Sequence, residues 1–192
     1  MTHSMNRLIP FVLVLGVLAL PACDLFGGTD DRPHAEIIIG TWDASGVNVL
    51  VDVGPVTVPV PVSDLAADEQ SFVFAGDGSF RFTYDPADDR RITITYDGET
   101  YVDVPLPDGP IVVEGEYELR QSEGVIHFST IEGQTGDDFV MEYDISNDRA
   151  GLELLAEDPR VLGLLFGLAG EEYQAFAQYV VGGSIDYERR QL

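Results

Sequence analysis

The chain contains no lysine, a single cysteine and a single tryptophan, and positive charge is scarce. Ten arginines stand against 34 aspartates and glutamates in 192 residues, so the formal net charge is −24. A chain of this charge repels phosphate backbones, which excludes DNA- and RNA-coating proteins and predicts no nucleic-acid partner. One cysteine cannot form an internal disulfide or supply the paired cysteines of a structural zinc site. Disorder is disfavoured, because 45% of the residues are hydrophobic and 10% are aromatic.

Long apolar runs are also scarce, and the N-terminal one, at 8–20, is interrupted by Pro10 and Gly16. It is shorter than the roughly 20 residues that a membrane span needs, and it is typical of the hydrophobic region of a signal peptide. The run ends in Leu20-Pro21-Ala22-Cys23. This tetrapeptide resembles the lipobox of bacterial lipoproteins, in which leucine lies three residues before the cleavage site, a small residue directly before it and cysteine directly after it.

The lipobox resemblance implies a signal peptide at 1–22, lipidation of Cys23 with acyl chains such as palmitate, and a tether at 23–35. The protein would then be lipid-anchored in a bacterial cell envelope, with a membrane as its partner. Two alternatives remain open: ordinary secretory cleavage, which fits poorly with the bulky Leu20, and a retained anchor, which fits poorly with Pro21. Lipidation also accounts for the lone cysteine, since an odd cysteine in an exported chain otherwise stays reactive or pairs between molecules.

The remaining residues, 36–192, have the pattern of an antiparallel all-β domain. Turn signals recur roughly every 8 to 15 residues, and β-branched and aromatic residues alternate between them. Asp-Gly between alternating apolar runs is a strong hairpin signal, because the turn requires positive φ. Hairpins are therefore predicted to turn at 76–78, at 97–98 and around Gly124.

A further hairpin, at 47–62, carries valine at every second position on either side of its Gly-Pro turn. Pro59 and Pro61 lie on the opposite phase of the second strand. Proline cannot donate a hydrogen bond to a sheet, so this strand is predicted at an edge or as a polyproline-like arm. The hairpin is either an apolar contact surface for a partner or a membrane, or an edge protected against aggregation. The second alternative is favoured.

Only one segment, 158–181, has a clear helical pattern. Asp158 is a capping residue, and Pro159 suits the first helical position. Apolar residues dominate 161–168, and a second apolar group follows with helical spacing. We expect two short helices, or one bent helix, as an insertion before a last strand at 184–190.

Five motifs occur in a familiar order: Gly40-Thr41-Trp42, the F-x-x-D-G-S-F hairpin at 74–80, strands at 115–119 and 126–129, and a final strand at 185–190 that ends in arginines. Together they resemble the lipocalins and the wider calycin barrels, and the hairpin is similar to that of bacterial lipocalin-like lipoproteins. The resemblance implies an antiparallel up-and-down barrel of about 8–10 strands. The helical insertion and the proline hairpin depart from the family pattern.

In calycins a basic residue lies across the barrel floor from the conserved tryptophan position. The resemblance therefore predicts that Trp42 touches Arg189, or Arg190, and that the pair closes one end of the barrel. An indole covers a large area, and a guanidinium stacked on it adds about 0.5–2 kcal/mol. The expected role of both residues is structural.

Signals for catalysis and metal binding are weak. The sequence has no G-x-S-x-G elbow, H-E-x-x-H motif, P-loop or G-x-G-x-x-G motif. His127 is a lone histidine within a strand, a setting that is more often structural than catalytic. None of the acid pairs has the spacing of a calcium loop, and a weak calcium site would require the loops at 85–89 and 137–138 to meet. We expect no enzymatic activity, no cofactor and no metal.

The expected function is that of a cell-envelope lipoprotein whose barrel binds a small apolar molecule, with the helix at 161–168 as a lid. The alternative is a filled core, as in many small barrels. The protein would then be a non-enzymatic structural or interaction lipoprotein that docks a protein partner. The candidate ligand-binding residues of the lumen are the aromatic strand residues Phe72, Phe74, Phe80, Phe82, Tyr84, Tyr117 and Phe128.

The acidic residues are spread along the whole chain rather than gathered in one tail. They either attract a basic partner or keep the protein solvated in salty surroundings, as abundant acids without lysine do in halophilic proteins. The even spread favours adaptation to salt.

Overall fold

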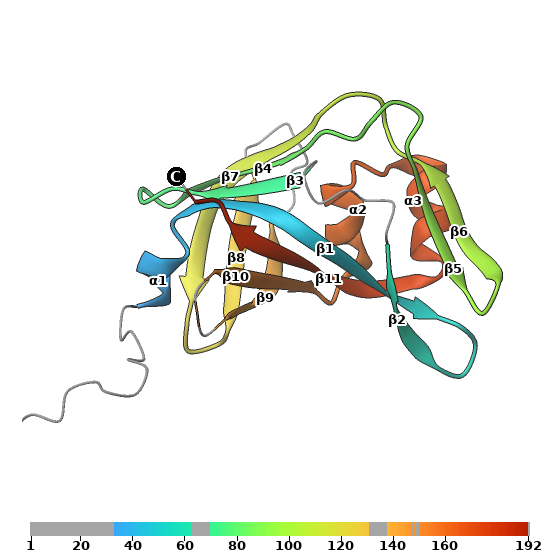
Figure 1. The fold of residues 1–192 in the computed structure, drawn as a ribbon, viewed down its shortest axis with the longest axis horizontal. Coiled ribbons are helices and arrows are strands. Elements are labelled where there is room, and N and C mark those ends of the chain that lie inside the picture. Colours follow the sequence, from blue (N-terminus) through green and yellow to red (C-terminus); the bar gives the residue numbers. More distant parts are fainter. Residues whose placement is uncertain (1–32, 63–69, 131–137, 147, 149, 192) are drawn as a thin grey trace, which may run out of the picture. The chain divides into compact units, whose positions relative to one another are not determined.

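Eight antiparallel strands close into a barrel in the computed structural model, which describes residues 33–62, 70–130, 138–146, 148 and 150–191 (Figure 1). Each strand pairs with the next around the wall, and β11 returns to pair with β1. The prediction of an all-β, up-and-down barrel is therefore confirmed. In order around the wall, the strands are β1 (Gly40–Asp52), β3 (Gln70–Phe74), β4 (Ser79–Tyr84), β7 (Ile111–Arg120), β8 (Val125–Thr130), β9 (Phe139–Ile145), β10 (Gly151–Ala156) and β11 (Val180–Arg189).

Alternating residues decide which side of each strand faces the core. In β4, Phe80 and Phe82 are buried, whereas Arg81 between them is exposed. The turn before β4 is fixed by Gly78, whose φ of +87° favours glycine, and by Asp77, which accepts hydrogen bonds from the backbone N–H and hydroxyl of Ser79. All three hairpins predicted from turn signals are present.

The second of these hairpins does not belong to the barrel wall. Its strands, β5 (Arg91–Tyr96) and β6 (Glu99–Pro105), form a two-stranded sheet of their own. Strand β4 pairs directly with β7, so the hairpin is an insertion between two neighbouring strands of the wall. It packs against helix α3 (Gly170–Ala177).

Strand β1 is long enough to have two partners along one side. Its first half pairs with β3, and its second half pairs with β2 (Thr57–Pro61), which lies at the end of the sheet. The N–H of Val62 donates to the carbonyl of Val47 on β1, so the backbone nitrogens of every second residue of this strand face β1. The nitrogens of positions 59 and 61 face away from β1, and because both residues are prolines, neither carries a hydrogen. The predicted edge strand is therefore confirmed, and its open side lacks these two donors.

Two short helices precede the last strand, as predicted. Helix α2 (Pro159–Leu165) begins after Asp158, whose side chain accepts a hydrogen bond from the backbone N–H of Arg160. Gly167, with φ of +65°, separates it from α3. A further one-turn helix, α1 (His34–Ile37), was not predicted; it spans the boundary between the predicted tether at 23–35 and the predicted barrel domain at 36–192. None of the helices in the described ranges has the length and hydrophobicity to cross a membrane.

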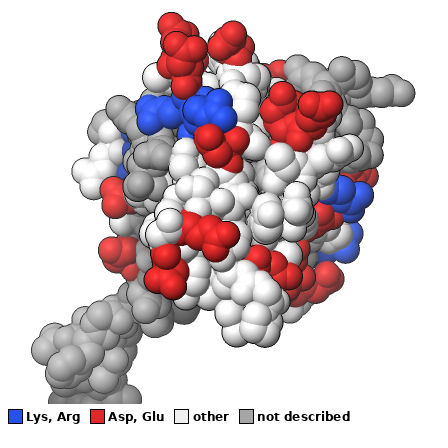
Figure 2. All heavy atoms as spheres, turned by 90° about the vertical axis from the view of Figure 1, so that its right-hand side faces the viewer, with Lys and Arg blue, Asp and Glu red and all other residues white. Residues whose placement is uncertain are grey.

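Acidic residues are dispersed over the surface. On the face that carries the β5–β6 hairpin and α3, separate acidic groups lie among uncharged side chains, with arginines beside some of them (Figure 2). This distribution agrees with the spread of acids along the sequence.

Candidate functional site

The aromatic residues predicted to line the lumen lie together inside the barrel as part of one hydrophobic core. All are buried except Tyr117, which is partly buried and donates its hydroxyl hydrogen bond to the carbonyl of Ala75 at 3.1 Å. The rings fill the layer that they form, which favours the filled alternative over an open lumen at this level. The ring centre of Phe72 lies 4.9 to 5.7 Å from those of Phe74, Phe80, Phe82 and Phe128, and Tyr84 contacts Phe166 of the helical insertion.

The segment predicted as a lid also belongs to this core. Leu162, Leu165 and Phe166 are fully buried, and α2 packs against β10 and β11. The helix therefore packs into the core and does not form a lid over an open lumen. Its apolar residues lie on more than one face, so burying them requires contacts on several sides of the helix.

Trp42 lies at the end of the barrel that is opposite to helix α2, and the guanidinium of Arg189 lies over its indole ring. The guanidinium carbon of Arg189 is 5.4 Å from the centre of the indole, within the usual range of a cation–π contact. The same guanidinium donates to the carbonyl of Ile39 at 2.6 Å, and the indole N–H of Trp42 donates to the carbonyl of Ile38 at 2.7 Å. Arg190 points elsewhere and pairs with Asp43.

Gln70 and Tyr187 are polar residues inside the core. Gln70 is 1% exposed, and its amide nitrogen and oxygen have no hydrogen-bond partner among the residues that the structure describes. Within the same residues the hydroxyl of Tyr187 has no partner either, and burial raises the pKa of this phenol. An unsatisfied buried polar group costs about 1–3 kcal/mol, so these groups weaken the fold.

The barrel wall has a gap at its helical end. Strand β10 pairs with β9 only from Ile145 to Glu142, so Phe139, Val140 and Met141 lie beyond the last pair. The chain leaves β10 after Ala156 and turns into α2. A cleft of about 760 Å³ opens where β9 and α2 face each other.

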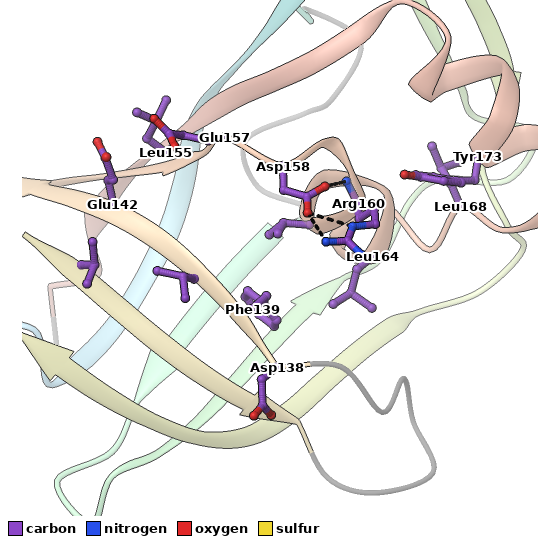
Figure 3. Close-up of a pocket in the computed structure, with 13 residues that line it drawn as sticks. Asp138, Phe139, Glu142, Leu155, Glu157, Asp158, Arg160, Leu164, Leu168 and Tyr173 are labelled. Carbon is purple, nitrogen blue, oxygen red and sulfur yellow. Dashed lines mark hydrogen bonds and ion pairs between the residues drawn. The ribbon is translucent and has the colours of Figure 1, made fainter.

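The cleft has an apolar interior. Phe139, which also stacks on Phe128 in the core with ring centres 4.7 Å apart, lines it from the strand side. Leu164 lines it from the helix side, with Leu168 and Tyr173 further along (Figure 3). Phe139 is therefore shared between the cleft and the aromatic core. The other apolar lining residues are Val125, Val140, Leu155 and Val161.

Charged residues also line the cleft. Asp138, Glu142 and Glu157 are exposed residues that line the cleft, together with Asp158 and Arg160 (Figure 3). The guanidinium of Arg160 donates to Asp158, with Nε 2.8 Å and Nη2 2.5 Å from Oδ2. These hydrogen bonds hold the pKa of the Asp158 carboxyl below its ordinary value. The described lining thus carries four carboxylates and one guanidinium.

No local pattern in the sequence predicts this cleft, because its two walls come from separate segments. The sequence does contain one indication, because Val140 is an apolar residue on the outward phase of its strand. In the structure it is 44% exposed. An exposed apolar residue beside an apolar helix is a weak indication of a binding surface.

Some sequence predictions fall on other parts of the chain. Cys23, the signal peptide and most of the tether lie outside the described residues. Among the residues that the structure does describe, no three His, Cys, Asp or Glu side chains are grouped to hold a metal ion. His127 is partly exposed on β8.

Comparison with known proteins adds no relative. No protein-family model matches the chain, and a search of curated proteins finds no significant match. The closed eight-stranded barrel is consistent with the calycin resemblance of 40–190. Evidence for a function therefore comes from the site itself.

Proposed function

We propose that the protein is a lipid-anchored protein of a bacterial cell envelope that binds a small apolar molecule in the cleft between β9 and α2. One observation carries the proposal: the cleft of about 760 Å³ is lined largely by apolar side chains, among them Phe139, which also stacks on Phe128 in the aromatic core. Ligand sites of proteins are concave, mostly apolar and about 300–1,000 Å³ in volume. The filled barrel then acts as the scaffold, and the polar groups of the cleft serve recognition rather than catalysis.

The anchoring half of the proposal rests on Leu20-Pro21-Ala22-Cys23. Two or three acyl chains on one cysteine hold a protein firmly, since each buried CH₂ contributes about 0.8 kcal/mol. We expect the protein expressed in a bacterial host to sediment with membranes and to incorporate a palmitate analogue. Cys23→Ser should abolish both properties, and retained labelling would contradict lipidation of this residue.

Leu164 allows the binding half to be tested without disturbing the core. It is partly exposed and lines the cleft, so Leu164→Gln should preserve the fold while making the interior polar. Leu119→Gln is the matched control, because Leu119 is also partly exposed but does not line the cleft. The neutral dye N-phenyl-1-naphthylamine should bind the wild type and the control with enhanced fluorescence. Its Kd should rise about tenfold or more in Leu164→Gln, by loss of roughly 1.4 kcal/mol or more; equal Kd values would contradict the site.

The filled core also favours the second candidate, a lipoprotein that docks a protein partner. Two docking surfaces were predicted for it, the apolar helix and the Val–Pro hairpin. Most apolar residues of α2 are buried in the core and cannot contact a partner. The Val–Pro hairpin does expose Val56, at 53%. Its edge, however, lacks two outward N–H groups and is poorly suited to pairing with another strand.

A further inference from the structure

The charges of the cleft restrict what it can bind. Its lining contains, beside the apolar side chains, the carboxylates of Asp138, Glu142 and Glu157, all on exposed residues. The one guanidinium of the described lining, that of Arg160, already forms hydrogen bonds with Asp158. A bound anion would lie among more negative than positive charges, whereas a cation would be attracted.

The arrangement of the two kinds of lining residue also suggests an orientation. Phe139 is 7% exposed and lies at the depth of the aromatic core, while the carboxylates belong to exposed residues. An apolar body placed against Phe139 and Leu164 would leave its polar end near exposed carboxylates, either Asp138 at one end of the lining or Glu142 and Glu157 at the other (Figure 3). A short polar head on an apolar body fits this division better than a molecule that is polar throughout.

We infer that the cleft selects amphipathic cations, molecules with an apolar body and one ammonium or amidinium group. The inference rests on the proposed function, because it assigns a ligand class to the same cleft. It is carried by charge complementarity: the described lining holds four carboxylates against one guanidinium.

Three surfactants with the same decyl chain isolate the contribution of the head group. Decyltrimethylammonium, decyl maltoside and decyl sulfate are titrated below their micelle concentrations against dye-loaded protein at physiological ionic strength. The cation should displace the dye at about tenfold lower concentration than the neutral maltoside, and the anion should be weaker than both. Equal potency of the three head groups would overturn the charge inference while leaving the cleft as a binding site. Failure of all three, and of the dye, to bind would overturn the proposed function itself.

A pair of double variants separates local attraction from the general attraction of an acidic protein. Glu142→Gln with Glu157→Gln removes two carboxylates of the cleft. Glu116→Gln with Glu188→Gln removes the same charge from exposed positions on β7 and β11. The cation's Kd should rise about tenfold only in the cleft variant, and the maltoside's Kd should change in neither. Equal weakening of the cation in both variants would overturn the inference, since net charge alone would then explain the preference.

Discussion

Gln70 is a buried polar residue in a part of the core that is otherwise apolar. It lies on the inward phase of β3 with Phe72 and Phe74, and none of the described residues forms a hydrogen bond with its amide. Replacing such a group with an apolar side chain of similar shape removes the cost of burying it. We expect Gln70→Leu to raise the free energy of unfolding by about 1–2 kcal/mol, as measured by urea denaturation.

A second glutamine provides the control for this prediction. Gln121 is exposed in the turn between β7 and β8, so Gln121→Leu should change stability by less than about 0.5 kcal/mol. If Gln70→Leu destabilised the protein by more than the control does, the amide would have to be satisfied in solution, for example by a buried water.

Arg189 is a second residue whose contribution to the free energy of unfolding can be predicted. Its guanidinium lies 5.4 Å from the centre of the Trp42 ring and donates to the carbonyl of Ile39. Arg189→Met keeps the length of the stem but removes both interactions, so the free energy of unfolding should fall by about 1–2 kcal/mol. Arg190→Met is the control, because Arg190 forms an ion pair with Asp43 on the surface, where such pairs contribute little to stability. Far-ultraviolet circular dichroism follows both, and equal losses would contradict a special role of Arg189.

At the scale of elements, the prolines of the edge strand β2 are predicted to keep molecules from pairing through this edge. Pro59 and Pro61 withhold the two N–H groups that would otherwise point away from the sheet. Pro59→Thr with Pro61→Thr restores both donors on a strand rich in valine, which should allow β2 edges of two molecules to pair. Light scattering after gel filtration should show dimers or larger species that increase with protein concentration. Pro110→Thr changes an exposed loop proline and should leave a monomer; a monomeric double variant would show that another feature protects the edge.

Local elements could be predicted from the sequence because their causes are local. Alternation and turn residues predict the strands and hairpins, and Asp158 with Pro159 predicts the start of α2. The short helix α1 was missed because one turn carries little pattern. It has a tertiary cause, since it buries Ile37 and leads to Ile38, whose carbonyl accepts from Trp42.

Features that depend on distant pairs could not be predicted in the same way. The gap between β9 and β10 follows from where their ladder stops, at Glu142 and Leu155, and neither residue signals an end of pairing. Whether the lumen is filled depends on how rings from several strands interdigitate, and alternation says only that they face inward. The Trp42–Arg189 contact was expected from family resemblance, because no local rule brings positions so far apart in the chain together.

At the scale of the whole molecule, electrostatic repulsion is the dominant feature. With 34 acids and 10 arginines, most carboxylates can have no basic partner. The ion pairs that do form, such as Arg91 with Asp103 at 2.6 Å, lie on the surface, where a pair contributes little. The net charge therefore opposes the compact state and keeps the molecules apart in solution.

This repulsion predicts a strong dependence of stability on salt. The screening length falls from about 10 Å at 0.1 M to about 3 Å at 1 M ionic strength, so distant carboxylates cease to repel one another. The Tm should rise steadily over this range, by about 2–4 °C for each kcal/mol of repulsion relieved. Differential scanning calorimetry in sodium chloride measures the rise, and Glu116→Gln with Glu188→Gln should reduce its slope by removing two of the repelling charges. A Tm that stays constant from low to molar salt would mean that the acids serve a basic partner instead of the solvent.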